Sequence, residues 1–384
     1  MAYANPLALA CFVLAGIGCV YALAAAVLAR RFRSGARQAL ADAPGVTILK
    51  PLHGIDTGQG DDLASFCDQD YRATVQVLFG VHQRGDPAVD IVERLRAMHP
   101  DRDLRLCITG DARGGNPKVG NLAGLQPFIG HEVVVIADSD IAVERDYLAT
   151  IVGALQQPGV GAVTCLYRGE RRGGLWARLS AIGINHRFVP GVLVGLALGI
   201  ARPCFGSTIA LKRDTLAAIG GFEAFVAELA DDYAIGAAVR ATGASVAIPP
   251  YVVTHVCSER SAAEWLAHEL RWARTVRAVS PAGHAGLLLT HPLPFALVGA
   301  SIAGFPPVSM AIIATAIACR LVLQREVEHT LRVRSKAGWL GPAHDLLAFA
   351  VHVASCFVGV VRWRGHRYAV RADGTLAPTG ESRR

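Results

Sequence analysis

The chain has 384 residues, of which 52% are hydrophobic and 18% charged, with nine cysteines and a formal charge of +7. That length exceeds one ordinary domain and can bury a large core. The positive charge comes without a basic-aromatic module, which argues against nucleic acid as a partner and favours anionic lipid headgroups. The cysteines stand singly without a CxxC pair, which argues against a zinc site or disulfide framework and for a catalytic part in the reducing cytosol.

The N-terminal segment is predicted to anchor the chain in a membrane. Residues 1–29 carry no charged side chain, and Leu7 to Ala29 is long enough to cross a bilayer. The basic residues Arg30, Arg31, Arg33 and Arg37 follow it. Because a cleaved signal peptide has its positive charge before the apolar run, we expect an uncleaved anchor over 1–30 with a cytoplasmic basic flank.

Residues 31–260 alternate between apolar β-forming runs and helical patterns. Strands are predicted at 45–52, 75–81, 104–108, 133–137, 160–166 and 206–211, and helices from 61, over 87–98, from 118 and over 228–240. This alternation is typical of an α/β nucleotide-binding domain with a mainly parallel sheet.

Two carboxylates follow the strand predicted at 133–137. Asp138 and Asp140 stand at the carboxyl end of that strand, where open α/β sheets bind ligands. Carboxylates at i and i+2 can share a hard divalent cation that also takes diphosphate oxygens. The alternative is an ordinary turn, because Asp and Ser are common turn residues.

Three more polar side chains are placed at or just after predicted strands and loops. Asp86 follows the second strand and either caps the next helix or accepts a hydrogen bond from a nucleotide. Lys118 opens a helix after a glycine-rich loop and suits a phosphate or base, although the loop is not a Walker motif. Asp232 opens another helix and is either a dipole partner or a base for an attacking hydroxyl.

The remaining segments suit a membrane or its surface. The apolar centre Phe188 to Ile200 is flanked by basic residues and is too short to span, so we expect it at the interface. Residues 261–283 contain the amphipathic helix Ala262 to Arg277, which is either an interfacial anchor or a lid over a substrate.

Residues 284–361 are expected to hold the C-terminal membrane segments. A break at Pro306-Pro307 separates the first two, and a charged stretch, 320–336, precedes the third. That third segment contains His344, Asp345 and His352, which are costly in lipid. The basic start of the tail, 362–384, is expected in the cytoplasm, so one segment is predicted not to cross.

The order of these residues resembles a known group of enzymes. Asp86, the Asp138 and Asp140 pair, Asp232 and Arg271-Trp272 resemble the spaced aspartates and closing (Q/R)xxRW of lipid-directed family 2-type glycosyltransferases. The chain is most similar to ceramide glucosyltransferases (family 21 type) and their bacterial relatives. The shared segments are KPLHGID (50–56), QDY (69–71), GDPAVD (85–90), NPKVGNL (116–122), ADSDI (137–141), LADDY (229–233) and HELRWART (268–275). GINHRF (183–188), ARPCFGSTIAL (201–211) and HELRWART resemble the bacterial hopanoid glycosyltransferases most.

The resemblance implies a GT-A nucleotide-sugar-binding domain with transmembrane helices at both ends, in the bacterial inner membrane with the catalytic domain in the cytoplasm. It implies a UDP-sugar donor, Mg²⁺ or Mn²⁺ as cofactor and a lipid acceptor. The implied reaction moves N-acetylglucosamine from UDP onto bacteriohopanetetrol. The alternative is transfer of glucose from UDP onto ceramide.

The resemblance also implies a role for each matching residue. Asp86 would contact the uridine and Lys118 the nucleotide, while Asp138 and Asp140 would hold the sugar diphosphate and its metal. Asp232 would be the base, and Arg271 with Trp272 would close on the diphosphate. His268 stands where the family has Gln or Arg, although imidazole can still donate a hydrogen bond to phosphate. A single base opposite the leaving group favours in-line displacement with inversion.

Two other classes of protein compete with this interpretation. A strand followed by DxD is also the nucleophile motif of haloacid-dehalogenase phosphatases, but that motif continues with Thr or Val where this chain has Ala142. It also tends to open its domain, whereas here it follows other strands. The second alternative is a catalytically inactive membrane scaffold.

Overall fold

The computed structural model describes residues 5–33, 40–55, 58–110, 114–334, 340–357, 360–363, 366–370 and 376–378. Arg37, Asp56 and the end of the polar tail, named in the sequence expectations, lie outside the described residues. The chain divides into two compact units. Unit 1 contains residues 1–34, 168–202 and 259–365, and unit 2 contains 35–167, 203–258 and 366–384.

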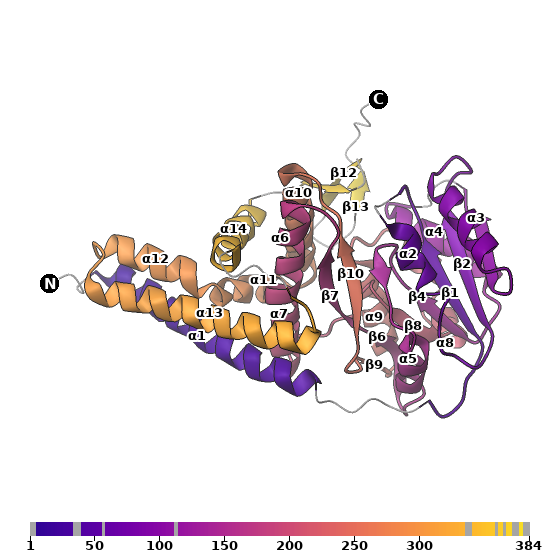
Figure 1. Ribbon diagram of the computed structural model, residues 1–384, viewed down its shortest axis with the longest axis horizontal. Coiled ribbons are helices and arrows are strands. Elements are labelled where there is room, and N and C mark those ends of the chain that lie inside the picture. The colour runs from indigo at the N-terminus through magenta and orange to yellow at the C-terminus, as the bar shows by residue number, and fades with distance from the viewer. Residues whose placement is uncertain are drawn as a thin grey trace. The chain divides into compact units, whose positions relative to one another are not determined.

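A seven-stranded sheet forms the centre of unit 2, with the strand order β3-β2-β1-β4-β8-β6-β9 (Figure 1). Its strands are β1 (Val46–Pro51), β2 (Val75–Val81), β3 (Asp103–Ile108), β4 (Val133–Ile136), β6 (Val160–Thr164), β8 (Ile209–Lys212) and β9 (Ser245–Ala247). Strands β3, β2, β1 and β4 run parallel, and β8 runs antiparallel to both of its neighbours. The predicted mainly parallel α/β sheet is therefore confirmed.

Strands β1 and β4 are buried along their whole length, as expected for parallel strands with helices on both faces. The helices of unit 2 are α2 (Gln59–Ala64), α3 (Ala88–Met98), α4 (Pro117–Leu125), η1 (Gln126–Phe128), α5 (Tyr147–Leu155), α8 (Arg213–Ala218), η3 (Phe222–Phe225) and α9 (Asp231–Ala241). One core cluster joins the sheet to α4, η3 and α9 and includes Leu49, Leu122, Val134, Phe222 and Val239. This core fixes the starts of α4 and α9 at one edge of the sheet.

A small second sheet, β5-β10-β7, differs from the sequence expectation. Its strands are β5 (Ile141–Ala142), β7 (Leu166–Arg171) and β10 (Val252–Cys257), and β5 pairs antiparallel with β10. The segment predicted as one strand over 160–166 is divided, because β6 ends at Thr164 and β7 begins at Leu166. The carbonyl of Cys165 between them accepts a hydrogen bond from the hydroxyl of Ser207 at 3.0 Å. The chain then continues as β7 in the second sheet.

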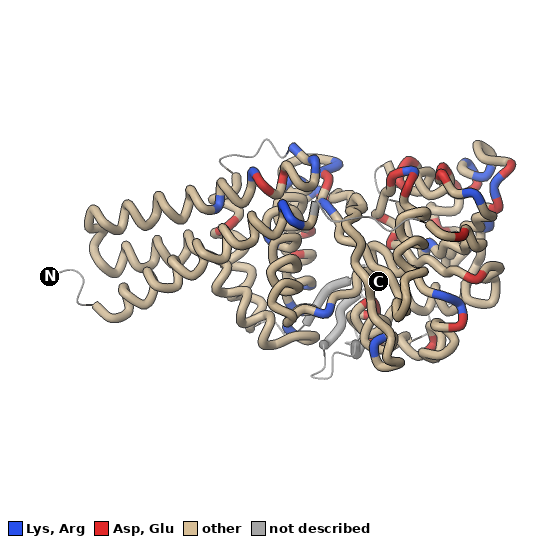
Figure 2. The backbone as a smooth tube through the Cα atoms, turned by 90° about the horizontal axis from the view of Figure 1, so that it is seen from below, with Lys and Arg blue, Asp and Glu red and all other residues tan. Residues whose placement is uncertain are grey.

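Unit 1 consists mainly of helices, and Figure 2 shows few charged residues along the part of them nearest the N-terminus. They are α1 (Pro6–Arg33), α6 (Leu175–Gly183), the π-helix η2 (Ile184–Phe188), α7 (Val189–Ala197), α10 (Ala262–Val279), α11 (Pro281–Leu287), η4 (Leu288–Thr290), α12 (Pro292–Ile302), α13 (Pro307–Leu331) and α14 (Leu340–Ser355). Apolar side chains of α1, α12 and α13 form one cluster that includes Ala15, Phe295 and Ala316. The short strand β11 (Val360–Trp363) follows in unit 1, whereas β12 (His366–Val370) and β13 (Leu376–Pro378), which pair antiparallel, belong to unit 2.

Three helices in the described residues are long and apolar enough to cross a membrane: Pro6–Phe32, Leu175–Ala197 and Pro307–Leu331. The bent pair Pro281–Thr290 and Pro292–Ile302, which turns by 63°, makes a fourth if it counts as one span. The segment around 188–200 is thus part of a longer helix than its apolar centre predicts. Helix α14 is not among these candidates.

Helix α13 continues to Leu331, into the stretch that was expected to separate two membrane segments. Two of its charged residues pair with neighbouring helices: Arg320 donates to Asp345 of α14, and Glu326 accepts from Arg30 of α1. Arg and Glu also have high helix propensities, so these residues favour continuation of the helix.

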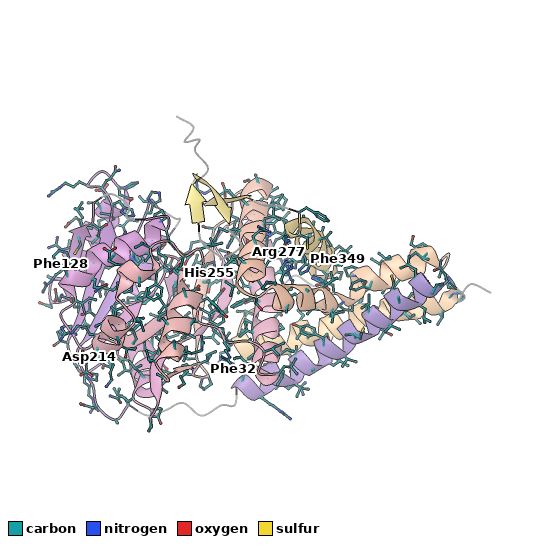
Figure 3. The ribbon with its side chains drawn as sticks, turned by 180° about the vertical axis from the view of Figure 1, so that it is seen from behind. Phe32, Phe128, Asp214, His255, Arg277 and Phe349 are labelled. Atoms are coloured by element: carbon teal, nitrogen blue, oxygen red, sulfur yellow. The ribbon has the colours of Figure 1, made fainter. Side chains whose placement is uncertain are left out.

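The basic end of α10 caps α14. Arg277 donates to the carbonyls of Ser355 at 3.1 Å and Cys356 at 2.5 Å (Figure 3 labels Arg277 and Phe349 of these helices). Basic side chains commonly satisfy the last carbonyls of a helix in this way. Arg277 therefore has a structural role within unit 1.

Candidate active site

The loop after β4 is held from both sides by main-chain hydrogen bonds. The N–H of Asp138 donates to the carbonyl of Gly206 at 3.2 Å, and the N–H of Val256 donates to the carbonyl of Asp140 at 2.8 Å. Lys50 of β1 adds a third contact, because its Nζ donates to the carbonyl of Asp138 at 2.5 Å. The two carboxylates predicted at this edge are thus carried by a restrained loop.

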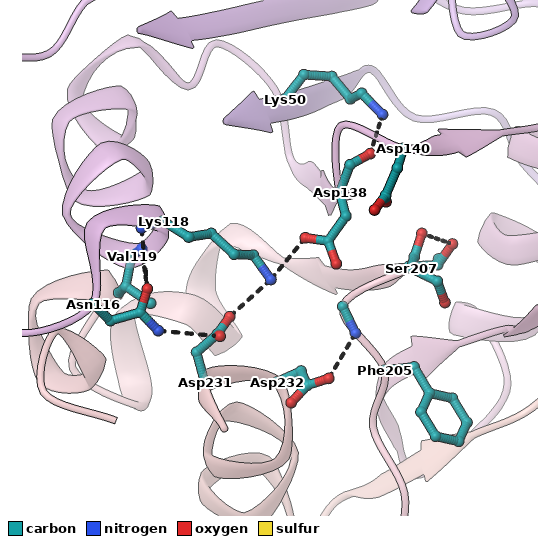
Figure 4. Close-up of polar contacts among 12 residues, drawn as sticks. Lys50, Asn116, Lys118, Val119, Asp138, Asp140, Phe205, Ser207, Asp231 and Asp232 are labelled. Carbon is teal, nitrogen blue, oxygen red and sulfur yellow. Dashed lines mark hydrogen bonds and ion pairs between the residues drawn. The ribbon is translucent and has the colours of Figure 1, made fainter. Parts of the chain in front are cut away.

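Lys118 lies between two carboxylates (Figure 4). Its Nζ is 2.8 Å from Oδ1 of Asp138 and 2.9 Å from Oδ2 of Asp231. Burial alone would lower the pKa of Lys118, but the surrounding carboxylates outweigh it and raise that pKa above its usual range. The lysine is therefore a fixed cation at the centre of the site.

The start of helix α4 sets the position of this lysine. Asn116 is its N-cap: the side-chain oxygen accepts from the N–H groups of Lys118 at 3.0 Å and Val119 at 3.2 Å. The Nδ2 of Asn116 donates to the carbonyl of Glu228 at 2.8 Å, which ties the start of α4 to the segment before α9. The Asn-Pro-Lys sequence thus sets the position of Lys118.

Asp232 occupies the start of α9 and reaches the same glycine that contacts Asp138. Its Oδ2 accepts from the N–H of Gly206 at 2.9 Å, and its Oδ1 accepts from the N–H of Tyr233 at 2.8 Å. Burial, followed by the neighbouring Asp231 carboxylate, raises the pKa of Asp232 to about 6, against the opposing effect of Lys118. A carboxylate with a pKa close to neutrality suits a general base.

Gly206 brings these groups together because it has no side chain. A Cβ at this position would lie 2.7 Å from Oδ2 of Asp138 and 2.9 Å from Nζ of Lys118. The backbone of residue 206 can therefore contact Asp232 while Asp138 and Lys118 pass close to its Cα.

His255 of β10 lies beside the second aspartate of the pair. Its Nδ1 is 3.5 Å from Oδ1 of Asp140, and its ring lies 5.7 Å from that of Tyr167. Burial raises the pKa of the Tyr167 hydroxyl, and the carboxylates of Asp232, Asp138 and Asp140 raise it further. Tyr167 and His255 thus belong to the site.

Several of these residues were missed from the sequence. His255 lies on a strand that the apolar pattern did not predict, and Lys50 looks like an ordinary strand residue of the KPLHGID segment. Gly206 lies in the predicted segment 206–211, but the need for glycine becomes visible only from the closeness of Asp138 and Lys118 to its Cα.

Asp86 lies after β2, as predicted, and its described contacts are with neighbouring loops. Its carboxylate accepts from the N–H groups of Gly54 at 3.0 Å and Ala88 at 2.9 Å and lies 3.6 Å from Nδ1 of His53. The contact with Ala88 is that of a residue that caps α3. Among the described residues, no hydrogen bond or ion pair joins Asp86 to the cluster around Lys118.

The residues of the HxxRW motif belong to unit 1. Nδ1 of His268 lies 2.5 Å from Oε1 of Glu259, and its ring meets that of Trp272 edge-on at 4.6 Å. Trp272 also lies 6.2 Å from the ring of Phe188. Burial opposes ionisation of Glu259, but the bond to His268 outweighs it and lowers the pKa of Glu259. Arg271 lies on the same helix, and its predicted contact with a diphosphate stays a prediction.

Asp138 and Asp140 supply only part of the ligand set that a divalent cation needs. Among the described residues, no group of three or more His, Cys, Asp or Glu side chains could hold a metal ion. Their side chains are 35% and 36% exposed, so both are open to solvent. Mg²⁺ and Mn²⁺ prefer one or two carboxylates plus phosphate oxygens and water, and this donor set fits that requirement.

Comparison with known proteins identifies the fold and the family. The mannosyltransferase PcManGT from Pyrobaculum calidifontis, solved in complex with GDP-Man and Mn²⁺, superposes with a TM-score of 0.58 at 22% identity, over 91% of this chain and 98% of that one. This likeness concerns the fold alone and confirms the predicted GT-A type architecture.

Two curated relatives from Caenorhabditis elegans are similar in sequence. Ceramide glucosyltransferase 1 is 29% identical over 220 residues, which are 57% of this chain and 46% of the relative. Ceramide glucosyltransferase 3 is 26% identical over 253 residues, which are 65% and 53% of the respective lengths. The chain thus spans about half the length of the curated relatives it matches.

The model of one protein family covers nearly the whole chain. It is that of glycosyl transferase family 21, and it matches residues 10–376. This match leaves the phosphatase and inactive-scaffold alternatives without support and confirms the glycosyltransferase class that the aspartates and the RW pair indicated. The chain belongs to glycosyl transferase family 21.

Proposed function

We propose that the protein is an inverting membrane glycosyltransferase that moves N-acetylglucosamine from UDP-N-acetylglucosamine onto the terminal hydroxyl of a hopanoid polyol, bacteriohopanetetrol. One observation carries the proposal: Gly206 contacts both Asp232, through its N–H, and Asp138, through its carbonyl. The candidate base and the first candidate donor-binding carboxylate therefore share one short segment of backbone. A base beside a donor site is what in-line transfer requires.

In the proposed reaction Asp232 accepts the proton of the acceptor hydroxyl. The hydroxyl oxygen forms a bond to the anomeric carbon while the bond from that carbon to the diphosphate breaks, so UDP departs and the configuration inverts. Asp138 and Asp140 would hold the cation, which supplies Lewis-acid stabilisation of the diphosphate when bound. Lys118 provides a fixed positive charge for the phosphates, and Arg271 with Trp272 is proposed to cover them.

Asp231 is unsuited to a covalent role. Its carboxylate contacts Lys118 at 2.9 Å and accepts from Nδ2 of Asn116 at 3.3 Å. A carboxylate that accepts an ion pair and a hydrogen bond is a weak nucleophile, because both contacts stabilise its negative charge. This supports a single displacement through Asp232.

Two pairs of substrates compete. The segments GINHRF, ARPCFGSTIAL and HELRWART support a hopanoid acceptor and N-acetylglucosamine. The curated relatives, both named ceramide glucosyltransferases, support ceramide and glucose as the second candidate. The apolar helices support a lipid acceptor and a membrane location, for which we propose the bacterial inner membrane with unit 2 in the cytoplasm.

The test is a matrix of two donors and two acceptors. Membranes containing the full chain are incubated with UDP-N-acetylglucosamine or UDP-glucose and with bacteriohopanetetrol or ceramide, and the product mass is read. We expect the mass of an N-acetylhexosamine added to the hopanoid. A product formed only with ceramide would replace this proposal with the second candidate, and no product with any pair would refute both.

A further inference from the structure

His82 directly follows β2 and lies at the edge of the main sheet that carries the candidate site. Strands β2, β1 and β4 run parallel, so the residues after them, among them His82 and Asp138, lie at the same edge. Open α/β sheets bind their ligands at this edge. None of the roles described above involves His82, although its side chain is half-buried there.

Both ring nitrogens of His82 contact main-chain carbonyls. Its Nδ1 lies 2.8 Å from the carbonyl oxygen of Gly110, just after β3, and its Nε2 lies 3.0 Å from that of Pro117, the first residue of α4. A carbonyl oxygen only accepts hydrogen bonds, so both contacts are hydrogen bonds when both ring nitrogens carry a proton. The ring then has a positive charge, which favours binding of a diphosphate at this edge of the sheet.

The contact with Pro117 bears on Lys118, the next residue along α4. The segment before α9 holds the start of this helix, because the N–H of Asn116 donates to the carbonyl of Val226 at 2.8 Å. The end of β2 holds it as well, through the contact of His82 with Pro117 at 3.0 Å. The first turn of α4, which carries Lys118, is thus restrained by two different segments of unit 2.

We propose that His82 is a positioning residue for donor binding, which holds the first turn of α4 so that Lys118 is in place before the UDP-sugar binds. The inference rests on the proposed function, which supplies a donor with a diphosphate. The protein itself uses both N–H groups of His82, so this residue acts through Lys118 rather than on the substrate. A cation that is ordered beforehand reduces the entropy lost when the donor binds, so the gain is in affinity.

The experiment uses variants of the full chain in lipid nanodiscs that differ in which hydrogen bond is kept. His82→Phe keeps a ring and removes both bonds. The amide nitrogen of His82→Gln can take the place of Nε2 and keep the contact with Pro117, whereas that of His82→Asn can take the place of Nδ1 and keep the contact with Gly110. His99→Phe is the matched control, because His99 is also half-buried but follows α3 and precedes β3, at the opposite edge of the sheet.

Titration calorimetry with UDP and Mn²⁺ measures the Kd for UDP, and UDP release during sugar transfer measures kcat. We expect His82→Phe and His82→Asn to raise the Kd about five- to tenfold, the effect of one lost hydrogen bond. The Kd of His82→Gln and that of His99→Phe should stay within twofold of wild type. The kcat should change less than twofold in every variant, because the bound donor itself keeps Lys118 in place.

A Kd for His82→Asn equal to or lower than that for His82→Gln would overturn the proposal, because a merely structural role does not single out the contact with Pro117. A lower kcat at an unchanged Kd would overturn it as well. If His82→Phe does not fold, the comparison of the Gln and Asn variants still decides. Wild type that binds no UDP would refute the donor of the proposed function, and this inference with it, whereas wild type that binds UDP and variants that behave alike would refute the inference alone.

Discussion

The ammonium of Lys118 lies 2.8 Å from a carboxylate oxygen of Asp138, the residue proposed to hold a cation with Asp140. A carboxylate has about four lone-pair sites, so Asp138 can contact the ammonium and a divalent cation at the same time, but the two positive charges repel each other. Entry of a cation with its diphosphate should therefore weaken the contact of Lys118 with Asp138 and favour its contacts with Asp231 and the phosphates. The ion pair is thus a property of the donor-free site.

Lys118→Met should separate cation binding from catalysis. Removal of the ammonium frees Asp138, so we expect the affinity for Mn²⁺ in the absence of UDP-sugar to rise several-fold, measured by titration calorimetry. The sugar transfer rate should fall at least tenfold, because the phosphates lose a fixed positive charge. Lys118→Arg is the matched control that keeps the charge. Unchanged Mn²⁺ affinity in the Met variant would show that Lys118 does not compete for the site.

Asp232→Asn should lower the transfer rate by about 10²- to 10⁴-fold, the usual contribution of a general base. The amide oxygen can accept the N–H of Gly206 or that of Tyr233 but not both, so the Tm of the purified protein should fall by only a few degrees, the effect of one lost hydrogen bond. UDP release from UDP-N-acetylglucosamine in the presence of the lipid is the measurement. Asp214→Asn, on the exposed face of α8, is the control and should retain full activity. A fully active Asp232→Asn variant would remove Asp232 from the mechanism.

The pH dependence of transfer should follow the carboxyl group of Asp232. Because its pKa is raised to about 6, the base is ionised above that pH, and kcat/KM should fall as the pH decreases through about 6. Stability should have the opposite sign. Folding raises this pKa above the unfolded value, so the contribution to stability is present below about pH 4 and is lost as the pH rises through 6. The Asp232→Asn variant should show neither this pH dependence of kcat/KM nor this pH dependence of stability.

Gly206→Ala tests the close approach at the centre of the site. A Cβ there would lie 2.7 Å from Oδ2 of Asp138, so the carboxylate or Lys118 must move. We expect transfer to fall at least tenfold, with the larger effect on the KM for the UDP-sugar. Gly174→Ala is the control, because a Cβ at that position has nothing within 4 Å and φ is −83°. Equal activity of the two variants would mean that the site accommodates a methyl group.

The buried pair Arg320 and Asp345 should behave as a unit. Arg320→Leu leaves the Asp345 carboxylate buried and unpaired, so the free energy of unfolding should fall by about 3–5 kcal/mol. The double variant with Asp345→Leu removes both charges and should regain most of that loss. Denaturant unfolding in detergent measures both changes. A double variant as unstable as the single one would show that the pair contributes more than its own charges.

The sequence predicted the central sheet well, because its buried strands are short apolar runs bounded by turn residues. The predicted strand Val75 to Val81 has the same bounds as β2, and the helix predicted to open at Lys118 begins one residue earlier, at Pro117. The prediction failed where tertiary contacts determine the bounds of a strand. β5 has only two residues, β9 has three, and the segment around Cys165 is divided between two sheets.

The candidate site was predicted only in part, because some of its residues are recognised only from their tertiary contacts. Asp138 and Asp232 are visible in the sequence as carboxylates at a strand end and a helix start, and the structure brings them to the same glycine. That glycine, together with Lys50 and His255, escapes prediction. Their roles come from contacts between residues that are far apart in the chain, such as Lys50 with Asp138, and a single sequence carries no signal for such contacts.

The antiparallel pairing of β4 with β8 also limits how the chain can be threaded through a bilayer. Two strands of one sheet must lie on the same side of a membrane, and residues 175–197 come between them. A chain that leaves one side and returns to it makes an even number of crossings, whereas one helix can make only a single crossing. The helix from Leu175 to Ala197, although long and apolar enough to span, therefore cannot cross the membrane as a single span.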